Sequence, residues 1–183
     1  MQGEGKAVRF IDIGANMTDE MFRGIYNGKQ AHTDDLDTVL ERAWSGGVEK
    51  IIVTCGNWDD IQQASELVKR SDRLYHTVGV HPTRCSEFES NPTEYLEKLI
   101  AVTQDESKRD KIVAIGEFGL DYDRVNFCPK VLKQHACYDR NLTPRICRKH
   151  NRNISNCSSN SRRKHNFLSS YTCGLPVTIL YRL

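Results

Sequence analysis

The chain has 183 residues, of which 38 % are hydrophobic and 27 % charged, with a net charge of +2, a composition ordinary for a soluble globular protein of one domain. No apolar run approaches the roughly 20 residues that a membrane-spanning helix needs, and the start of the chain lacks the apolar core of a secretory signal. These features predict a soluble intracellular protein, neither secreted nor membrane-spanning.

The first third of the chain predicts a strand followed by a helix. The segment VRFIDI at residues 8–13 is apolar and β-branched and ends at Gly14, which predicts a buried strand. Thr33 is predicted to cap a helix that ends at Gly46 and Gly47. The apolar positions of this helix recur at helical spacing and are Leu36, Val39, Leu40, Ala43 and Trp44.

The same pattern then repeats. KIIVTCG at 50–56 predicts a second strand, and Asn57 is predicted to cap a second helix. LYHTVGV at 74–80 predicts a third strand, followed by a helix capped by Asn91, with Pro92 at its first position. The buried residues of these two helices are predicted to be Ile61, Ala64, Leu67 and Val68 in one, and Tyr95, Leu96, Leu99 and Ile100 in the other.

A fourth strand and the loop that leaves it are predicted at 111–123, KIVAIGEFGLDYD, and complete a βαβαβαβ order. Strands that are apolar throughout and alternate with amphipathic helices predict a parallel sheet covered by helices. The pattern fits a doubly wound sheet and a barrel equally well.

Beyond residue 130 the helical and strand periods stop. Residues 131–183 carry seven Arg, three Lys and one acidic residue, a net charge of +9, whereas residues 1–130 carry 16 basic and 23 acidic residues, a net charge of −7. We therefore expect two regions, with the second mostly irregular apart from one compact apolar stretch, LPVTILY at 175–181, that can form a strand. This difference in net charge between the two regions fits either a basic arm that binds nucleic acid or a segment of unrelated coding origin.

The seven cysteines form no CxxC pair. Without a secretory context this predicts reduced thiols and no disulfide partner. The cysteines are Cys55, Cys85, Cys128, Cys137, Cys147, Cys157 and Cys173.

Polar residues follow all four predicted strands, at the ends where the loops of a parallel α/β fold converge. Carboxylates with one imidazole suit Mg²⁺, Mn²⁺ or Zn²⁺, which activate water and clamp a phosphate, so the set indicates a hydrolase. Taken singly, Glu117 is equally a solvated or helix-capping carboxylate, and His81 a turn residue. The residues in question are Asp12, Asn16, Asn57, His81, Glu117, Asp121 and Asp123.

Three segments together resemble the TatD family of metal-dependent deoxyribonucleases, and more closely its eukaryotic branch. They are FIDIGANMTDEMFRGIYNGKQAHTDDL at 10–36, VGVHPTRCSEFE at 78–89 and VAIGEFGLDYDRVNFCPK at 113–130. The resemblance implies that residues 1–130 form the first four βα units of a TIM-like (β/α)₈ amidohydrolase-type barrel. It also implies hydrolysis of phosphodiester bonds in DNA with up to two divalent metal ions, and a place in the nucleus or cytoplasm.

Carried over by residue, the resemblance makes Glu117 a catalytic metal ligand that can bridge two ions. His81 matches the His-Pro that follows the third strand and is expected near the substrate phosphate as a catalytic residue. Where many members have a His-x-His pair at the first strand, this chain has Asp12 and Asn16, which are expected to face the metal pocket. Asp121 is expected to face the same pocket.

The later motifs of the family, LHCR, HSF and ETDAP, have no counterpart in this chain. His135, His150 and His165 stand in other contexts and receive no role. Four strands do not close a barrel, so we expect that residues 131–183 are a frame-shifted or alternatively spliced tail on a catalytically inactive form. A nucleic-acid-binding arm through 161–165, SRRKH, and a zinc site of tail Cys and His residues are alternatives, the second disfavoured by the lack of tight ligand pairs. The oligomeric state is left open.

Overall fold

The computed structural model describes residues 8–118 and the backbone of two later strands at 167–172 and 175–181. Four parallel strands are hydrogen-bonded in the order in which they occur along the chain. They are β1 (Phe10–Ala15), β4 (Val48–Val53), β5 (Leu74–Val78) and β6 (Ile112–Ile115). Because a doubly wound sheet reverses its strand order, this unbroken order favours the barrel alternative.

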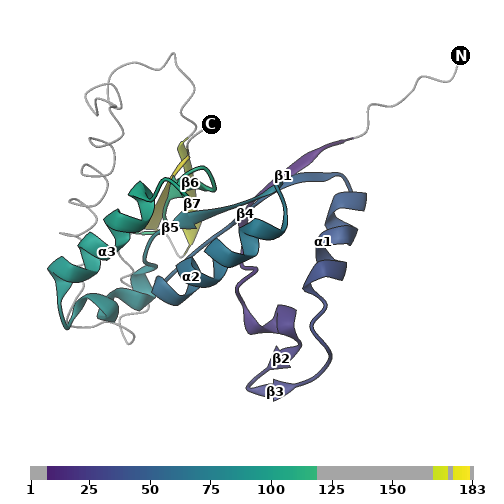
Figure 1. Ribbon diagram of the computed structural model, residues 1–183, viewed down its shortest axis with the longest axis horizontal. Coiled ribbons are helices and arrows are strands. Elements are labelled where there is room, and N and C mark those ends of the chain that lie inside the picture. The colour runs from purple at the N-terminus through teal and green to yellow at the C-terminus, as the bar shows by residue number, and fades with distance from the viewer. Residues whose placement is uncertain (1–7, 119–166, 173–174, 182–183) are drawn as a thin grey trace, which may run out of the picture.

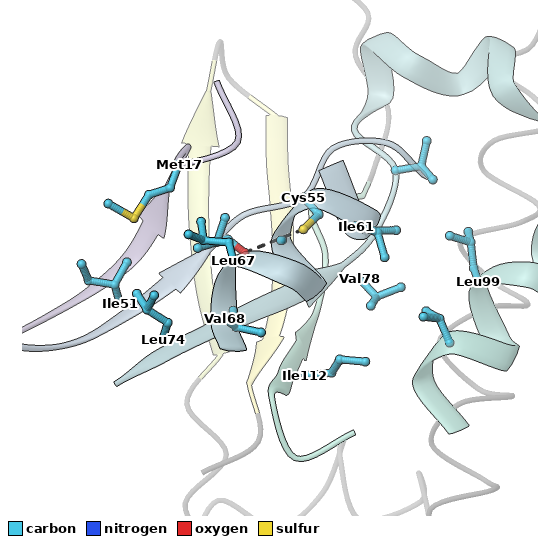
Figure 2. Packing of buried hydrophobic residues seen from close by; sticks show 14 of the residues in the cluster. Met17, Ile51, Cys55, Ile61, Leu67, Val68, Leu74, Val78, Leu99 and Ile112 are labelled. Atoms are coloured by element: carbon cyan, nitrogen blue, oxygen red, sulfur yellow. Dashed lines mark hydrogen bonds between the residues drawn. The ribbon is translucent and has the colours of Figure 1, made fainter. Parts of the chain in front are cut away.

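A helix follows each of the first three parallel strands. α2 crosses the sheet between α1 and α3 (Figure 1). Buried residues of all three helices and of the strands form one apolar core, part of which is drawn in Figure 2, and the predicted inner faces of the helices are confirmed. The helices are α1 (Leu36–Ser45), α2 (Trp58–Leu67) and α3 (Pro92–Gln104).

Two of the three predicted helix caps are confirmed. Asn57 accepts the Asp60 N–H at 2.8 Å, and Asn91 accepts the Glu94 N–H at 3.2 Å. The Thr33 cap is wrong, because α1 begins after Asp35, and the Leu36 N–H is bound by Asp34 Oδ1 at 3.1 Å instead. Thr33, Asp34 and Asp35 are all possible cap residues in succession, and sequence alone does not decide which of their side chains binds the helix start.

Loss of the Asn91 cap is expected to weaken α3 measurably. Asn91 both accepts the Glu94 N–H and donates its side-chain amide to Glu94 Oε2 at 2.8 Å. Asn91→Ala should lower the free energy of unfolding by about 1 kcal/mol, seen as a lower urea midpoint with an unchanged slope. Thr93→Ala, on the exposed side of the same turn, is the control and should unfold as the parent does. Equal midpoints for both variants would contradict the cap.

The loop after β1 contains structure that the sequence analysis did not predict. It holds the short helix η1 (Glu20–Arg23) and a hairpin of β2 (Ile25–Tyr26) and β3 (Lys29–Gln30). The turn residues Asn27 and Gly28 have φ values of 51° and 71°. An Asn-Gly pair is a recognised hairpin signal, so this element was legible in the sequence.

β1 lies at one edge of the six-stranded sheet, so the prediction that the first strand is buried is wrong. Val8, Phe10 and Ile11 are 68 %, 53 % and 53 % exposed. β1 has a partner in β4 on one side and none on the other among the described residues. An apolar sequence predicts a strand correctly but does not reveal whether both of its sides are covered.

Two strands of the basic region join the sheet. β8 (Leu175–Tyr181) pairs antiparallel with β6 and with β7 (Phe167–Thr172). The predicted strand at 175–181 is confirmed, whereas the expectation of irregular structure is wrong at 167–172. The sequence of β7, FLSSYT, does not alternate cleanly between apolar and polar residues. Its strand conformation therefore depends on pairing with a neighbouring strand and could not be predicted from its own pattern. Residues 119–166 lie outside the described part.

The expectation of reduced thiols holds at one described cysteine and not at the other. Cys55 is free and buried, whereas Cys85 is disulfide-bonded. Pairing between cysteines far apart in sequence depends on the fold and cannot be read from spacing alone. In the described part of the chain, no helix has both the length and the apolar character that a membrane span requires.

Candidate active site

Glu117 stands directly after the carboxyl end of β6, where β5 and β6 approach each other closely. The Gly116 N–H donates to the Val78 carbonyl at 2.9 Å. A Cβ placed on Gly79 would lie 2.4 Å from the Gly116 carbonyl carbon, so no side chain fits at residue 79. The Glu117 side chain is 27 % exposed. Its backbone is therefore held in place while its carboxylate can still meet solvent or a ligand.

His81 stands at the carboxyl end of β5 and begins the short helix η3 (Pro82–Phe88). Its Nδ1 accepts the Thr83 N–H at 3.2 Å and lies 2.8 Å from Thr83 Oγ1. Since Nδ1 is an acceptor, the neutral ring carries its proton on Nε2. The hydrogen bond to Thr83 thus decides which nitrogen of the His81 ring carries the proton.

The structure brings His81 and Glu117 together. His81 Nε2 lies 3.9 Å from Glu117 Oε2, and the two side chains are 21 % and 27 % exposed. This distance exceeds that of a hydrogen bond. Two residues 36 positions apart, both predicted as catalytic, therefore form one half-buried acid–imidazole pair.

Two other predicted site residues, Asp12 and Asn16, make hydrogen bonds to residues close to them in sequence. The Asp12 Oδ1 accepts the Gly14 N–H at 3.0 Å on its own strand. Asn16 is exposed, and its carbonyl accepts the Asp19 N–H at 3.1 Å. Asp121 lies outside the described residues. Whether these three side chains face a metal pocket stays a prediction.

The donor chemistry at Glu117 and His81 suits a divalent cation, but the number of donors within the described residues does not. A carboxylate and an imidazole are ligands for Mg²⁺, Mn²⁺ and Zn²⁺. Catalytic sites usually have three or more protein ligands, and no group of three His, Cys, Asp or Glu residues that could hold an ion occurs in the part that the structure describes. A metal site that includes Glu117 and His81 would therefore need further ligands beyond those that residues 8–118 bring together.

Two carboxylates that connect elements near this end of the sheet were not singled out from the sequence. Glu87 Oε2 in η3 accepts the Trp58 N–H at 3.2 Å and the Tyr95 hydroxyl, which links η3 to α2 and α3. Burial and the Glu87 carboxylate raise the pKa of Tyr95, so its hydroxyl stays a donor. The second carboxylate, Asp60, follows the Asn57 cap at the spacing of a capping box, and that spacing is the signal that could have found it.

Sequential parallel strands, intervening helices and an acid–imidazole pair at the carboxyl ends place the chain in the TIM-barrel class. The family model described as TatD related DNase matches residues 11–143, and the chain belongs to the TatD family. The predicted fold is confirmed by a solved structure, the hydrolase TatD family protein from Entamoeba histolytica. It is 38 % identical, has a TM-score of 0.69, and is matched over 80 % of this chain and 48 % of that one.

Curated relatives give the same assignment. "Deoxyribonuclease Tat-D" of Schizosaccharomyces pombe is 43 % identical over 127 residues, covering 68 % of this chain and 41 % of the relative. "3'-5' ssDNA/RNA exonuclease TatD" of Citrobacter rodentium is 34 % identical over 126 residues, covering 69 % and 41 %. The chain thus spans about two fifths of the length of these relatives. Membership of this family implies divalent metal ions as cofactors.

Proposed function

We propose that the protein is a metal-dependent deoxyribonuclease in which Glu117 is a metal ligand and His81 contacts the substrate phosphate. The observation that carries the proposal is the Glu117–His81 pair, 3.9 Å apart at the carboxyl ends of adjacent parallel strands. Active groups of TIM-barrel enzymes gather at this end. Mg²⁺, Mn²⁺ and Zn²⁺ are the candidate ions, because the two side chains offer oxygen and imidazole donors.

The proposed substrate is DNA, and the similarity to the 3'-5' ssDNA/RNA exonuclease TatD of Citrobacter rodentium extends the test to single-stranded RNA. End-labelled single-stranded DNA, duplex DNA and single-stranded RNA should each be incubated with the purified chain and Mn²⁺, Mg²⁺, Zn²⁺ or EDTA. The length of the products separates exonuclease from endonuclease action. A tagged copy of the chain shows by microscopy whether it enters the nucleus, as we propose from the family resemblance.

Glu117→Gln is expected to reduce metal-dependent cleavage to the level of the EDTA control, because the amide keeps the shape of the side chain but not its negative charge. Glu89→Gln removes the same charge from an exposed residue at the end of η3 and should leave cleavage unchanged. Cleavage that survives in Glu117→Gln, or that continues in EDTA, would contradict the proposal.

A second candidate is that this chain is catalytically inactive. It is favoured by the number of candidate ligands among the described residues, which falls short of the three or more that catalytic metal sites usually have. It predicts no cleavage by the parent protein and a melting temperature that Mn²⁺ does not raise. Metal-dependent cleavage by the parent protein would exclude it.

A third candidate is nucleic-acid binding by the basic region, which is favoured by its net charge of +9. Binding carried by phosphate contacts weakens steeply with salt and shows little sequence preference. Replacing Arg162, Arg163 and Lys164 together by Ser should then weaken DNA binding and flatten its salt dependence. Unchanged binding by this variant would exclude the SRRKH segment.

A further inference from the structure

Asp60 connects the loops that leave three parallel strands. It sits in the first turn of α2, but its carboxylate turns back from the helix. Oδ2 accepts the Gly56 N–H at 3.0 Å, in the loop after β4. Oδ1 accepts the Thr18 hydroxyl at 3.2 Å, in the loop after β1. A capping box would bring the Asp60 carboxylate back to the N–H of the cap residue Asn57, so it accounts for neither bond, and the second joins another element altogether.

Gly56 in turn is hydrogen-bonded to the third loop, which follows β5. Its carbonyl accepts the His81 N–H at 2.8 Å. A Cβ on Gly56 would lie 3.2 Å from His81 Cβ and 3.5 Å from Asp60 Oδ2. Gly56 is therefore bound through its N–H by Asp60 and through its carbonyl by the His81 N–H, which links the position of the His81 backbone to that of Asp60.

A neighbouring residue offers a matched comparison. Gln63 lies one turn along α2, and its Oε1 accepts from Arg23 Nη1 at 3.1 Å, while Arg23 Nη2 donates to the Thr18 carbonyl at 3.4 Å. Gln63 thus also ties the loop after β1 to α2. It makes no contact with Gly56, so it shares one connection of Asp60 and lacks the one that leads to His81.

We propose that Asp60 is a positioning residue of the candidate active site, which through Gly56 places His81 beside Glu117 and through Thr18 fixes the loop after β1. The inference rests on the proposed function insofar as His81 and Glu117 form the active site. Asp60 does not touch the substrate in this account. It keeps three loops in one arrangement, which would reduce the reorganisation needed when substrate binds.

The test compares Asp60→Ala with Gln63→Ala in ¹⁵N-labelled full chain by amide hydrogen exchange. Alanine removes both carboxylate oxygens and with them the bonds to Gly56 and Thr18, so exchange at Gly56 and His81 should accelerate about ten-fold or more. The His81 ring resonances should shift as well. Gln63→Ala, the same truncation one turn along the helix, should leave both amides and the ring unchanged. Equal behaviour of the two variants, or an unaltered His81 in Asp60→Ala, would overturn the proposal.

A further variant keeps the test informative if Asp60→Ala does not fold. Thr18→Val removes one hydroxyl and leaves the Gly56 connection in place, so His81 should stay protected while the loop after β1 loosens. Loss of protection at His81 in Thr18→Val would contradict the proposed route through Gly56. If the parent cleaves DNA, Asp60→Ala should lower kcat more than it alters KM. If the parent does not cleave, the proposed function fails, and the exchange data still decide the role of Asp60.

Discussion

Gly79→Ala is expected to be among the most damaging single substitutions in the described part of the chain. The new Cβ would lie 2.4 Å from the Gly116 carbonyl carbon and 2.6 Å from the Glu117 carbonyl oxygen. Both are backbone atoms, so they cannot yield by rotating a side chain. The β5 and β6 ends must separate, and we expect a loss of about 2–3 kcal/mol or more in the free energy of unfolding.

The same substitution should also disturb the candidate site, because the displaced peptide is that of Glu117. Thermal and urea unfolding measure the stability loss, and the Glu117 amide resonance reports the displacement. Gly14→Ala is the matched control, since a Cβ on Gly14 has nothing within 4 Å. It should unfold within about 0.5 kcal/mol of the parent. A Gly79→Ala protein with the parent's stability and an unmoved Glu117 resonance would show that β5 and β6 do not meet as described.

Acidification below neutrality is expected to destabilise the fold through His76. The ring is fully buried in β5, with Nδ1 2.9 Å from the Thr77 carbonyl and Nε2 3.4 Å from Ser65 Oγ. Burial, and next the positive charge of Lys108, hold its pKa at about 4 against an ordinary value of 6.5, although the Thr77 carbonyl acts in the opposite direction. The nearby Cys55 thiol is neutral, because burial raises its pKa.

The sign of the effect follows from proton uptake. Between pH 6.5 and 4 the unfolded chain binds a proton at residue 76 that the folded chain does not, so stability falls as the pH is lowered through this range. The stabilisation is complete above pH 6.5, and its full loss is about 3 kcal/mol. Urea unfolding at a series of pH values measures it.

His76→Gln should flatten this pH dependence, because glutamine does not titrate. The variant is expected to be less stable than the parent at neutral pH, since it replaces a packed ring. Replacement of the exposed His32 by Gln is the control and should retain the parent's slope between pH 6.5 and 4. A His76→Gln protein with the parent's slope would assign the acid sensitivity to another group.

Local signals in the sequence determined the alternation of strands and helices. The Asn57 and Asn91 caps and the Gly46 helix end were predicted correctly because each depends on residues within one helical turn. The inner faces of the helices followed from apolar spacing for the same reason. The strand order then agreed with a barrel, since consecutive βα units place successive strands side by side.

The candidate site likewise combines features that the sequence predicted with features that only the fold determines. The sequence predicted Glu117 and His81 separately, from their positions after strands and from the family resemblance. Their 3.9 Å separation required the parallel pairing of β5 with β6. Asp60 was legible as a capping-box residue, but its bonds to Thr18 and Gly56 join residues 42 and 4 positions away, and no local pattern encodes the first of them.

The chain by itself thus determined the alternation of the four parallel strands with three helices, the starts of α2 and α3, the end of α1, and which polar groups stand at strand ends. The tertiary structure decided that β1 is an exposed edge, that β8 pairs with β6, and that Asp60 reaches the peptide next to His81. The first group of features depends on neighbours within a few residues along the chain. The second depends on contacts between residues far apart in sequence, which exist only once the sheet and the helices have packed together.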